Sequence, residues 1–159
     1  MPIESLDHYS VRTANVDRAV MFYERTLGFR RGARPAFNFP GAWLYRVAAD
    51  GEITGGSVVH IVGIDPNDSA GLSDYLGEKP ASQAVGSGAL DHIAFVACDI
   101  TAMYTEMRRQ KIDFRERKVP NMALHQIFIE DPDGVTIELN YAHPDDLAAG
   151  QLHLACTPA

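Results

Sequence analysis

Two stretches of the chain show the same order of hydrophobic and polar positions. Residues 6–13 and residues 90–97 are rich in Tyr, Val, Ile and Phe and have the length of a β-strand. After each stretch, apolar residues recur at helical spacing, first at Val16, Ala19, Val20, Tyr23 and Leu27 and then at Ile100, Met103, Tyr104 and Met107. Asn15 and Asp99 stand at the N-cap positions, and Gly28 follows the end of the first helix. The pattern predicts a strand followed by an amphipathic helix, twice along the chain.

Strand-like sequence follows each predicted helix. In the first half, residues 42–48 and 57–63 are separated by the Gly-rich turn ADGEITGG. In the second half, residues 124–130 and 135–141 are joined by DPDG, which is typical of a hairpin turn. Each half is therefore expected to form a strand, a helix, and then two or three antiparallel strands.

The two halves are related by an internal repeat in which residue 92 falls on residue 8. The tripeptide Leu-Asp-His occurs in both, so His8 and His92 are equivalent. In the last predicted strand of each half, one polar residue stands among apolar neighbours: His60 in the first half and Glu138 in the second. Burying an unpaired carboxylate at Glu138 would be costly, unless a metal ion, a salt bridge or exposure on a polar face satisfies it.

Each half thus offers one potential metal ligand from its first strand and one from its last. Taken singly, a strand histidine is usually an ordinary core or surface residue. In a repeat, a pseudo-twofold arrangement would bring all four side chains together: His8, His60, His92 and Glu138. Imidazole nitrogens with one carboxylate suit Fe(II), Mn(II), Co(II), Ni(II) or Zn(II), and suit calcium or magnesium poorly. The repeat therefore predicts a site for one divalent metal ion.

The segment between the halves is rich in Gly, Ser, Pro and Asp, which is typical of a linker. We expect a first module at residues 1–64, a linker at 65–88, a second module at 89–142 and a C-terminal tail at 143–159, together forming one domain. A short helix is expected within AGLSDYLG in the linker.

The composition of the chain limits the classes of molecule that it is expected to bind. The chain has 159 residues, 46% of them hydrophobic, and a formal net charge of −7. This charge argues against a nucleic-acid or anionic-membrane surface and favours a small-molecule substrate. Neither a long apolar run nor a signal peptide is visible, so we expect a cytoplasmic protein. Cys98 and Cys156 lie far apart without a CxxC pair, and two thiols are expected.

Three sequence runs identify a resemblance to the vicinal oxygen chelate superfamily, which includes glyoxalase I, methylmalonyl-CoA epimerase, extradiol dioxygenases, and fosfomycin and bleomycin resistance proteins. They are DHYSVRTANVDRAVMFYERTLGF, LDHIAF and FIEDPDGVTIEL, within Leu6 to Tyr141. The resemblance implies an α+β fold of two tandem βαβββ modules, whose curved sheets face each other around a metal cleft. It places His8, His92 and Glu138 on the family's ligand positions. His60 departs from the Glu or Gln that is common at its position.

The resemblance leaves the reaction open. Four ligands on a six-coordinate metal leave two positions for a substrate that chelates through adjacent oxygens, which favours proton-transfer, lyase or isomerase chemistry. Three ligands leave room for dioxygen as well, as in an Fe(II) extradiol-type dioxygenase. A non-catalytic protein that sequesters an aromatic or antibiotic ligand is a third possibility. In the proton-transfer reaction, Glu138, His60 or His125 would act as the catalytic base.

Further residues are weaker candidates. His125 lies on the strand before the DPDG turn, on the same predicted face as Ile127 and the opposite face from Phe128. Residues 34–46 concentrate aromatic side chains that would line a substrate pocket or belong to ordinary core packing. Candidates to meet a substrate carboxylate are Arg12, Arg34 and Arg115. The family's modules often pair across two subunits, so a homodimer is expected.

Overall fold

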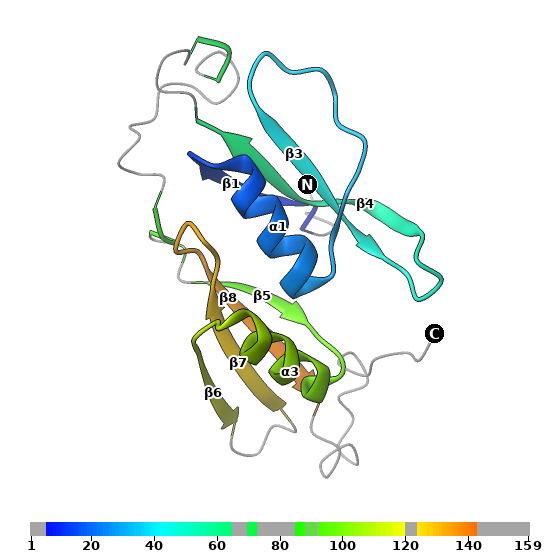
Figure 1. The fold of residues 1–159 in the computed structure, drawn as a ribbon, viewed down its shortest axis with the longest axis vertical. Coiled ribbons are helices and arrows are strands. Elements are labelled where there is room, and N and C mark those ends of the chain that lie inside the picture. Colours follow the sequence, from blue (N-terminus) through cyan, green and yellow to red (C-terminus); the bar gives the residue numbers. More distant parts are fainter. Residues whose placement is uncertain are drawn as a thin grey trace, which may run out of the picture. The chain divides into compact units, whose positions relative to one another are not determined.

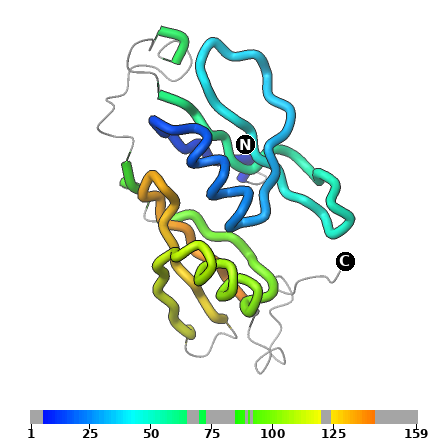
Figure 2. The backbone as a smooth tube through the Cα atoms, viewed as in Figure 1, coloured from blue at the N-terminus to red at the C-terminus, as the bar shows by residue number. Residues whose placement is uncertain are grey.

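The computed structural model describes residues 6–64, 70–72, 85–88, 90, 92–119 and 124–142. The chain divides into two compact units, Met1–Gly86 and Ser87–Ala159, which are called the first and second modules below (Figures 1 and 2). Each module contains one four-stranded sheet and one long helix. The expected α+β fold of two modules is confirmed, whereas the expected linker, tail and short helix lie mostly outside the described residues.

In the first module, the chain runs through β1 (Tyr9–Thr13), α1 (Val16–Leu27), β2 (Arg30–Arg31), β3 (Gly41–Val47) and β4 (Ile53–Gly63). The strand order is β1-β4-β3-β2, with β1 parallel to β4 and the other pairs antiparallel. β4 begins earlier than predicted, because part of the Gly-rich turn pairs with β3 through register shifts at Tyr45.

One face of the first sheet packs against α1. Val11, Leu44, Val59 and Ile61 are buried on this face, and the Tyr9 hydroxyl donates to the Tyr23 hydroxyl of α1 at 3.4 Å. Because side chains alternate along a strand, the residues between them lie on the opposite face. The face of each sheet opposite its own helix is called the far face below.

The second module repeats this order with β5 (Ile93–Val96), α3 (Ile100–Gln110), β6 (Phe114–Val119), β7 (Leu124–Glu130) and β8 (Thr136–Ala142). The strand order is β5-β8-β7-β6, again with the first and last strands parallel. The two sheets therefore have the same topology. Sequence patterns predicted α1 and β7 with these bounds but missed the short β2 and the polar β6.

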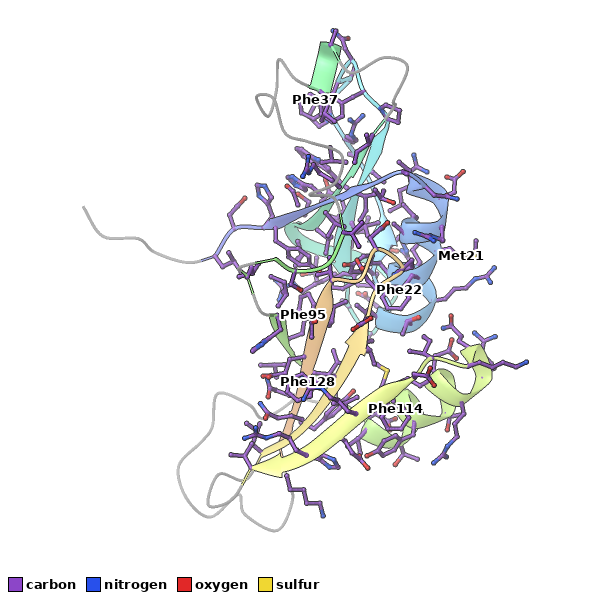
Figure 3. The ribbon with its side chains drawn as sticks, turned by 90° about the vertical axis from the view of Figure 1, so that its left-hand side faces the viewer. Met21, Phe22, Phe37, Phe95, Phe114 and Phe128 are labelled. Carbon is purple, nitrogen blue, oxygen red and sulfur yellow. The ribbon has the colours of Figure 1, made fainter. Side chains whose placement is uncertain are left out.

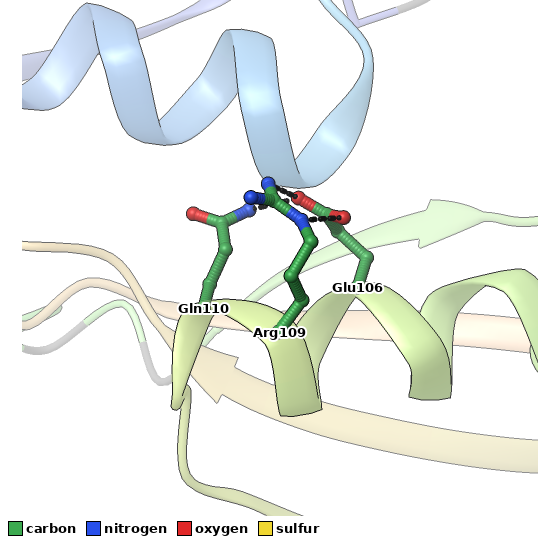
Figure 4. Close-up of polar contacts among 3 residues, drawn as sticks. All are labelled: Glu106, Arg109 and Gln110. Atoms are coloured by element: carbon green, nitrogen blue, oxygen red, sulfur yellow. Dashed lines mark hydrogen bonds and ion pairs between the residues drawn. The ribbon is translucent and has the colours of Figure 1, made fainter.

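The helix-facing core of the second sheet is made of Ile127, Ile137 and Leu139, with Met107 of α3 fully buried. On its other side, α3 carries polar residues: Glu106 accepts hydrogen bonds from Arg109 and Gln110 (Figure 4). This division into an apolar and a polar side is what the helical spacing predicted.

The structure corrects one further expectation. Cys98 is disulfide-bonded, so the expectation of two thiols is wrong; two isolated cysteines carry no spacing signal that would have indicated pairing. Cys156 lies outside the described residues. Among the described helices, none has the length and apolar character that crossing a membrane requires.

Candidate metal and substrate site

The far face of the first sheet carries a stack of three aromatic rings. The ring of His60 lies between that of His8, at a centroid distance of 3.7 Å, and that of Trp43, at 4.2 Å and nearly parallel. The backbone explains this stack, because Ser10 and Trp43 are the register partners of His60, and His8 stands two residues before Ser10. His8 itself immediately precedes β1. The structure thus brings together the two histidines that the sequence predicted for this module.

Each of these histidines has one further polar contact. Asp7 bonds Nδ1 of His8 through Oδ2, which leaves Nε2 of His8 facing away from that carboxylate. A carboxylate on one ring nitrogen is the usual support for a histidine that binds metal through the other. His60 bonds the Ser57 hydroxyl through Nε2 at 2.7 Å. A metal bound through this nitrogen would have to displace Ser57, whereas binding through Nδ1 would leave the bond in place.

The environment of His60 keeps its imidazole neutral. His60 is 6% exposed, and burial together with the neighbouring His8 lowers its pKa from 6.5 to about 4. A neutral imidazole has a free lone pair on one nitrogen, and this is the form that binds metals. The donor chemistry of His60 therefore fits a metal ligand, although Ser57 already contacts one of its nitrogens.

The far face of the second sheet carries the corresponding pair. Nε2 of His92 lies 3.4 Å from Oε2 of Glu138, and Glu138 is only 7% exposed. Glu138 pairs with Ala94 of β5, and His92 stands two residues before Ala94. His92 thus precedes its strand, as His8 precedes β1 in the first module.

Strand register confirms that His60 and Glu138 are equivalent positions. His60 pairs with Ser10 and Trp43, while Glu138 pairs with Ala94 and Phe128. The repeat therefore extends to the tertiary structure of each module. In each case the histidine before the first strand contacts the polar residue of the last strand.

The other oxygen of Glu138 accepts from one amide, which is itself oriented by a second. The Asn140 side-chain amide donates to Oε1 of Glu138 at 2.7 Å, and the Gln126 amide donates to the Asn140 carbonyl at 3.1 Å. The directions of these two hydrogen bonds agree with each other. An ionised carboxylate only accepts, so Asn140 turns its NH₂ group toward Glu138 and its carbonyl oxygen toward Gln126. Oε2 of Glu138 is left beside His92.

His125 lies on the other face of the second sheet. It pairs with Tyr141, on the side that faces α3, and its Nε2 lies 3.0 Å from a Glu116 oxygen that also accepts from the Tyr104 hydroxyl. The Tyr104 hydrogen bond is the main reason that the pKa of Glu116 is lowered. The predicted role of His125 as acid or base stays a prediction, and this placement away from Glu138 does not favour it.

The aromatic segment of the first module is partly on the far face. Trp43 stacks on His60, Phe37 lies 6.2 Å from Trp43, and Phe37 stacks on Phe39 at 5.2 Å. The Arg34 guanidinium lies over both phenylalanine rings and donates to the Phe39 carbonyl. Phe39 is buried, so core packing accounts for part of this cluster, while half-buried Trp43 adjoins the candidate ligand His60.

Over the residues that the structure describes, neither module by itself gathers three His, Cys, Asp or Glu side chains into a metal site. Each module offers one pair of candidate metal ligands. Sequence analysis did not single out Ser57, Asp7, Gln126 or Asn140, which support these pairs. The alternation of β8 would have placed Asn140 on the same face as Glu138, two residues away.

The comparison with known families decides the identity of the fold. The family model described as the Glyoxalase/Bleomycin resistance protein/Dioxygenase superfamily matches residues 5–139. The chain belongs to this superfamily. The match spans both modules and all four predicted metal ligands, and it confirms the resemblance inferred from the sequence motifs.

Two curated proteins are similar to this superfamily member in sequence. Glyoxylase I 4 of Arabidopsis thaliana is 29% identical over 140 residues, which cover 86% of this chain and 70% of that protein. The uncharacterized protein YwbC of Bacillus subtilis is 23% identical over 135 residues, covering 84% of this chain and 94% of YwbC.

Solved structures agree on the fold. The fosfomycin resistance protein FosX of Listeria monocytogenes superimposes with a TM-score of 0.61 and 14% identity, covering 92% of this chain and 98% of FosX. That FosX structure, of a variant, contains Mn(II) and 1S,2S-dihydroxypropylphosphonic acid. At this identity the likeness concerns the fold alone.

Proposed function

We propose that this superfamily member is a divalent-metal-dependent enzyme that catalyses proton-transfer chemistry, as a lyase or isomerase, on a small substrate that chelates through adjacent oxygens. His8 and His60 from the first module and His92 and Glu138 from the second would hold one ion of Fe, Mn, Co, Ni or Zn. The observation that carries the proposal is the matching pair of metal-compatible side chains on the far face of each module.

The second pair has the geometry of adjacent metal ligands. Donor atoms about 2.1 Å from one ion, at an angle between 90° and 110°, are separated by roughly 3.0 to 3.4 Å. His92 Nε2 and Glu138 Oε2 lie 3.4 Å apart, which is longer than an ordinary hydrogen bond and fits this range. The donor set of three imidazoles and a carboxylate also suits the metals named.

The residues of the chain supply the proton chemistry. When bound, the metal would polarise the substrate carbonyl and stabilise the negative charge that develops on its oxygen. Glu138 would accept the proton that leaves the carbon next to this carbonyl. The Asn140 amide holds Oε1 of Glu138, and Oε2 lies beside His92. His60 is the alternative acceptor, because its imidazole is neutral.

The test is metal content after loading with Mn(II), Co(II), Ni(II), Zn(II) or Fe(II). We expect one ion per chain in the wild type, and a loss of stoichiometric binding in His8→Ala, His92→Ala and Glu138→Ala. His125→Ala is the matched control, because its ring lies on the opposite face of the sheet and should leave metal content unchanged. Full binding in all three ligand variants would refute the site. Absence of metal together with tight binding of an aromatic ligand would instead indicate a sequestering protein.

One observation favours a second function. Because Ser57 bonds Nε2 of His60, a set of three ligands without His60 is the alternative, as an Fe(II) extradiol-type dioxygenase would need. Trp43, the single tryptophan, stacks on His60 and should report metal binding there through fluorescence quenching by Co(II). If His60→Ala leaves metal affinity unchanged and the Fe(II)-loaded protein consumes oxygen with catechol, the dioxygenase replaces the lyase or isomerase.

A further inference from the structure

We infer that Arg115, on the far face of the second sheet, binds a carboxylate of the substrate, so that the enzyme acts on small carboxylic acids. The inference rests on the proposed function, because it concerns the same face that presents His92 and Glu138.

The position of Arg115 follows from strand register. Arg115 pairs with Phe128, and Phe128 pairs with Glu138, so the three side chains form one row across β6, β7 and β8. Phe128, labelled in Figure 3, is 8% exposed and occupies the middle position of this row. Directly paired residues of a sheet project from the same face. Arg115 therefore shares a face with the proposed metal ligand Glu138.

Side-chain contacts link the same residues. The Arg115 guanidinium lies 3.9 Å from the centre of the Phe128 ring, and the His92 ring meets Phe128 edge-on at 6.1 Å. His92 in turn lies beside Glu138. The same ring, Phe128, therefore contacts both Arg115 and His92. A substrate that chelates beside His92 could therefore extend its carboxylate to Arg115.

Arg115 carries a positive charge beside the candidate ligands of the second sheet. Among the described residues, no carboxylate pairs with the Arg115 guanidinium. Its neighbour Glu116 points to the helix side and bonds Tyr104 and His125. Arg117 is also on the far face, since it pairs with Gln126, and it adds a second positive charge on β6.

Contact with Phe128 pre-organises the Arg115 guanidinium for binding. The Arg115 guanidinium lies over the face of the Phe128 ring, and the N–H groups around the edge of a guanidinium match the two oxygens of a carboxylate. Holding the guanidinium in one plane also reduces the entropy lost on binding. Exposed Arg117 has no such ring contact among the described residues, so it is the matched control for charge without stacking.

The experiment compares two chelating probes on the Co(II)-loaded protein by calorimetry. Benzohydroxamate chelates through adjacent oxygens, and 4-carboxybenzohydroxamate adds a carboxylate at the far end of the ring. We expect the carboxylated probe to bind the wild type about tenfold more tightly, as a charge-assisted bidentate contact contributes. Arg115→Gln should abolish this preference, Arg115→Lys should retain part of it, and Arg117→Gln should retain most of it.

The outcomes separate this inference from the proposed function. Equal affinity of the wild type for both probes, or equal effects of Arg115→Gln and Arg117→Gln, would overturn the inference while leaving the metal site intact. If neither hydroxamate binds better to the metal-loaded protein than to the metal-free protein, the proposed function fails. Fluorine NMR titration of the metal-free protein with 4-fluorobenzoate then decides the role of Arg115. Line broadening that Arg115→Gln removes and Arg117→Gln keeps supports it, and any other pattern overturns it.

Discussion

Glu138 shows how one residue depends on its neighbours for a defined chemical role. A carboxylate in the middle of β8 would be costly to bury without partners, yet it is held by the Asn140 amide on one oxygen and faces His92 with the other. The second amide, from Gln126, fixes the orientation of the first. If Glu138 binds a metal ion as proposed, Asn140 and Gln126 would orient it without contacting the metal themselves.

Replacing Asn140 by Leu should weaken divalent-metal binding by about 10- to 100-fold, because Oε1 of Glu138 loses its donor and the carboxylate is free to rotate. The measurement is a Co(II) titration followed by calorimetry. Thr136→Val is the control, since Thr136 lies on the same face of β8 at the other side of Glu138, and no side-chain bond between the two is present. An unchanged affinity in the Asn140 variant would show that Glu138 is oriented by the backbone alone.

At the scale of elements, the helices of the two modules are capped in the same way by different residues. Both helices begin with a short polar side chain that accepts from a first-turn amide, Asn15 from Arg18 at 3.0 Å and Asp99 from Ala102 at 2.9 Å. Both end in the left-handed region, at Gly28 in the first module and at Lys111 in the second. Only glycine adopts that conformation without a steric cost.

Gly28→Ala and Lys111→Gly should therefore change stability in opposite directions. No atom lies within 4 Å of a Cβ built on Gly28, so the cost of alanine, about 1 kcal/mol, comes from the backbone conformation alone. Lys111→Gly should raise the free energy of unfolding by about 0.5 to 1 kcal/mol, because it relieves a positive φ of 56°. Urea unfolding with an unchanged m-value checks both. Destabilisation by Lys111→Gly would mean that side-chain contacts of Lys111 outweigh the backbone cost.

At the scale of the whole molecule, each module folds around its own core and carries its own pair of candidate ligands. The expected homodimer stays a prediction, which a measurement of mass in solution checks against the 17.4 kDa of one chain. A metal ion held by ligands from both modules would couple their stabilities, because binding to the folded state alone stabilises everything that must be folded to bind it.

We expect a divalent metal at about 100 times its dissociation constant to stabilise the protein by about 2.7 kcal/mol, which raises the midpoint of thermal unfolding by several degrees. A chelator should reverse the shift. His8→Ala, in the first module, and Glu138→Gln, in the second, should each abolish it, whereas His125→Ala should keep it. If variants of only one module abolish the shift, the metal belongs to that module and the four-ligand site is wrong.

Local sequence patterns determined several of the helices, strands and turns of this protein. The helical spacing from Val16 and the glycine at Gly28 predicted α1, and the DPDG turn predicted the β7–β8 hairpin, because caps, turns and periodicity act over a few residues. The repeat predicted that His60 and Glu138 are counterparts, and strand register confirms it. The polar strand β6 was missed because its five exposed residues show no apolar alternation.

Tertiary structure decided which side chains meet. That His8 and Trp43 enclose His60, that Gln126 bonds the Asn140 amide beside Glu138, and that Arg115 lies over Phe128 all follow from pairing between strands. Periodicity assigns a residue to a face, but register determines its neighbours across the sheet. The repeat of Leu-Asp-His therefore indicated where ligands would be found, and the paired strands determined what surrounds each of them.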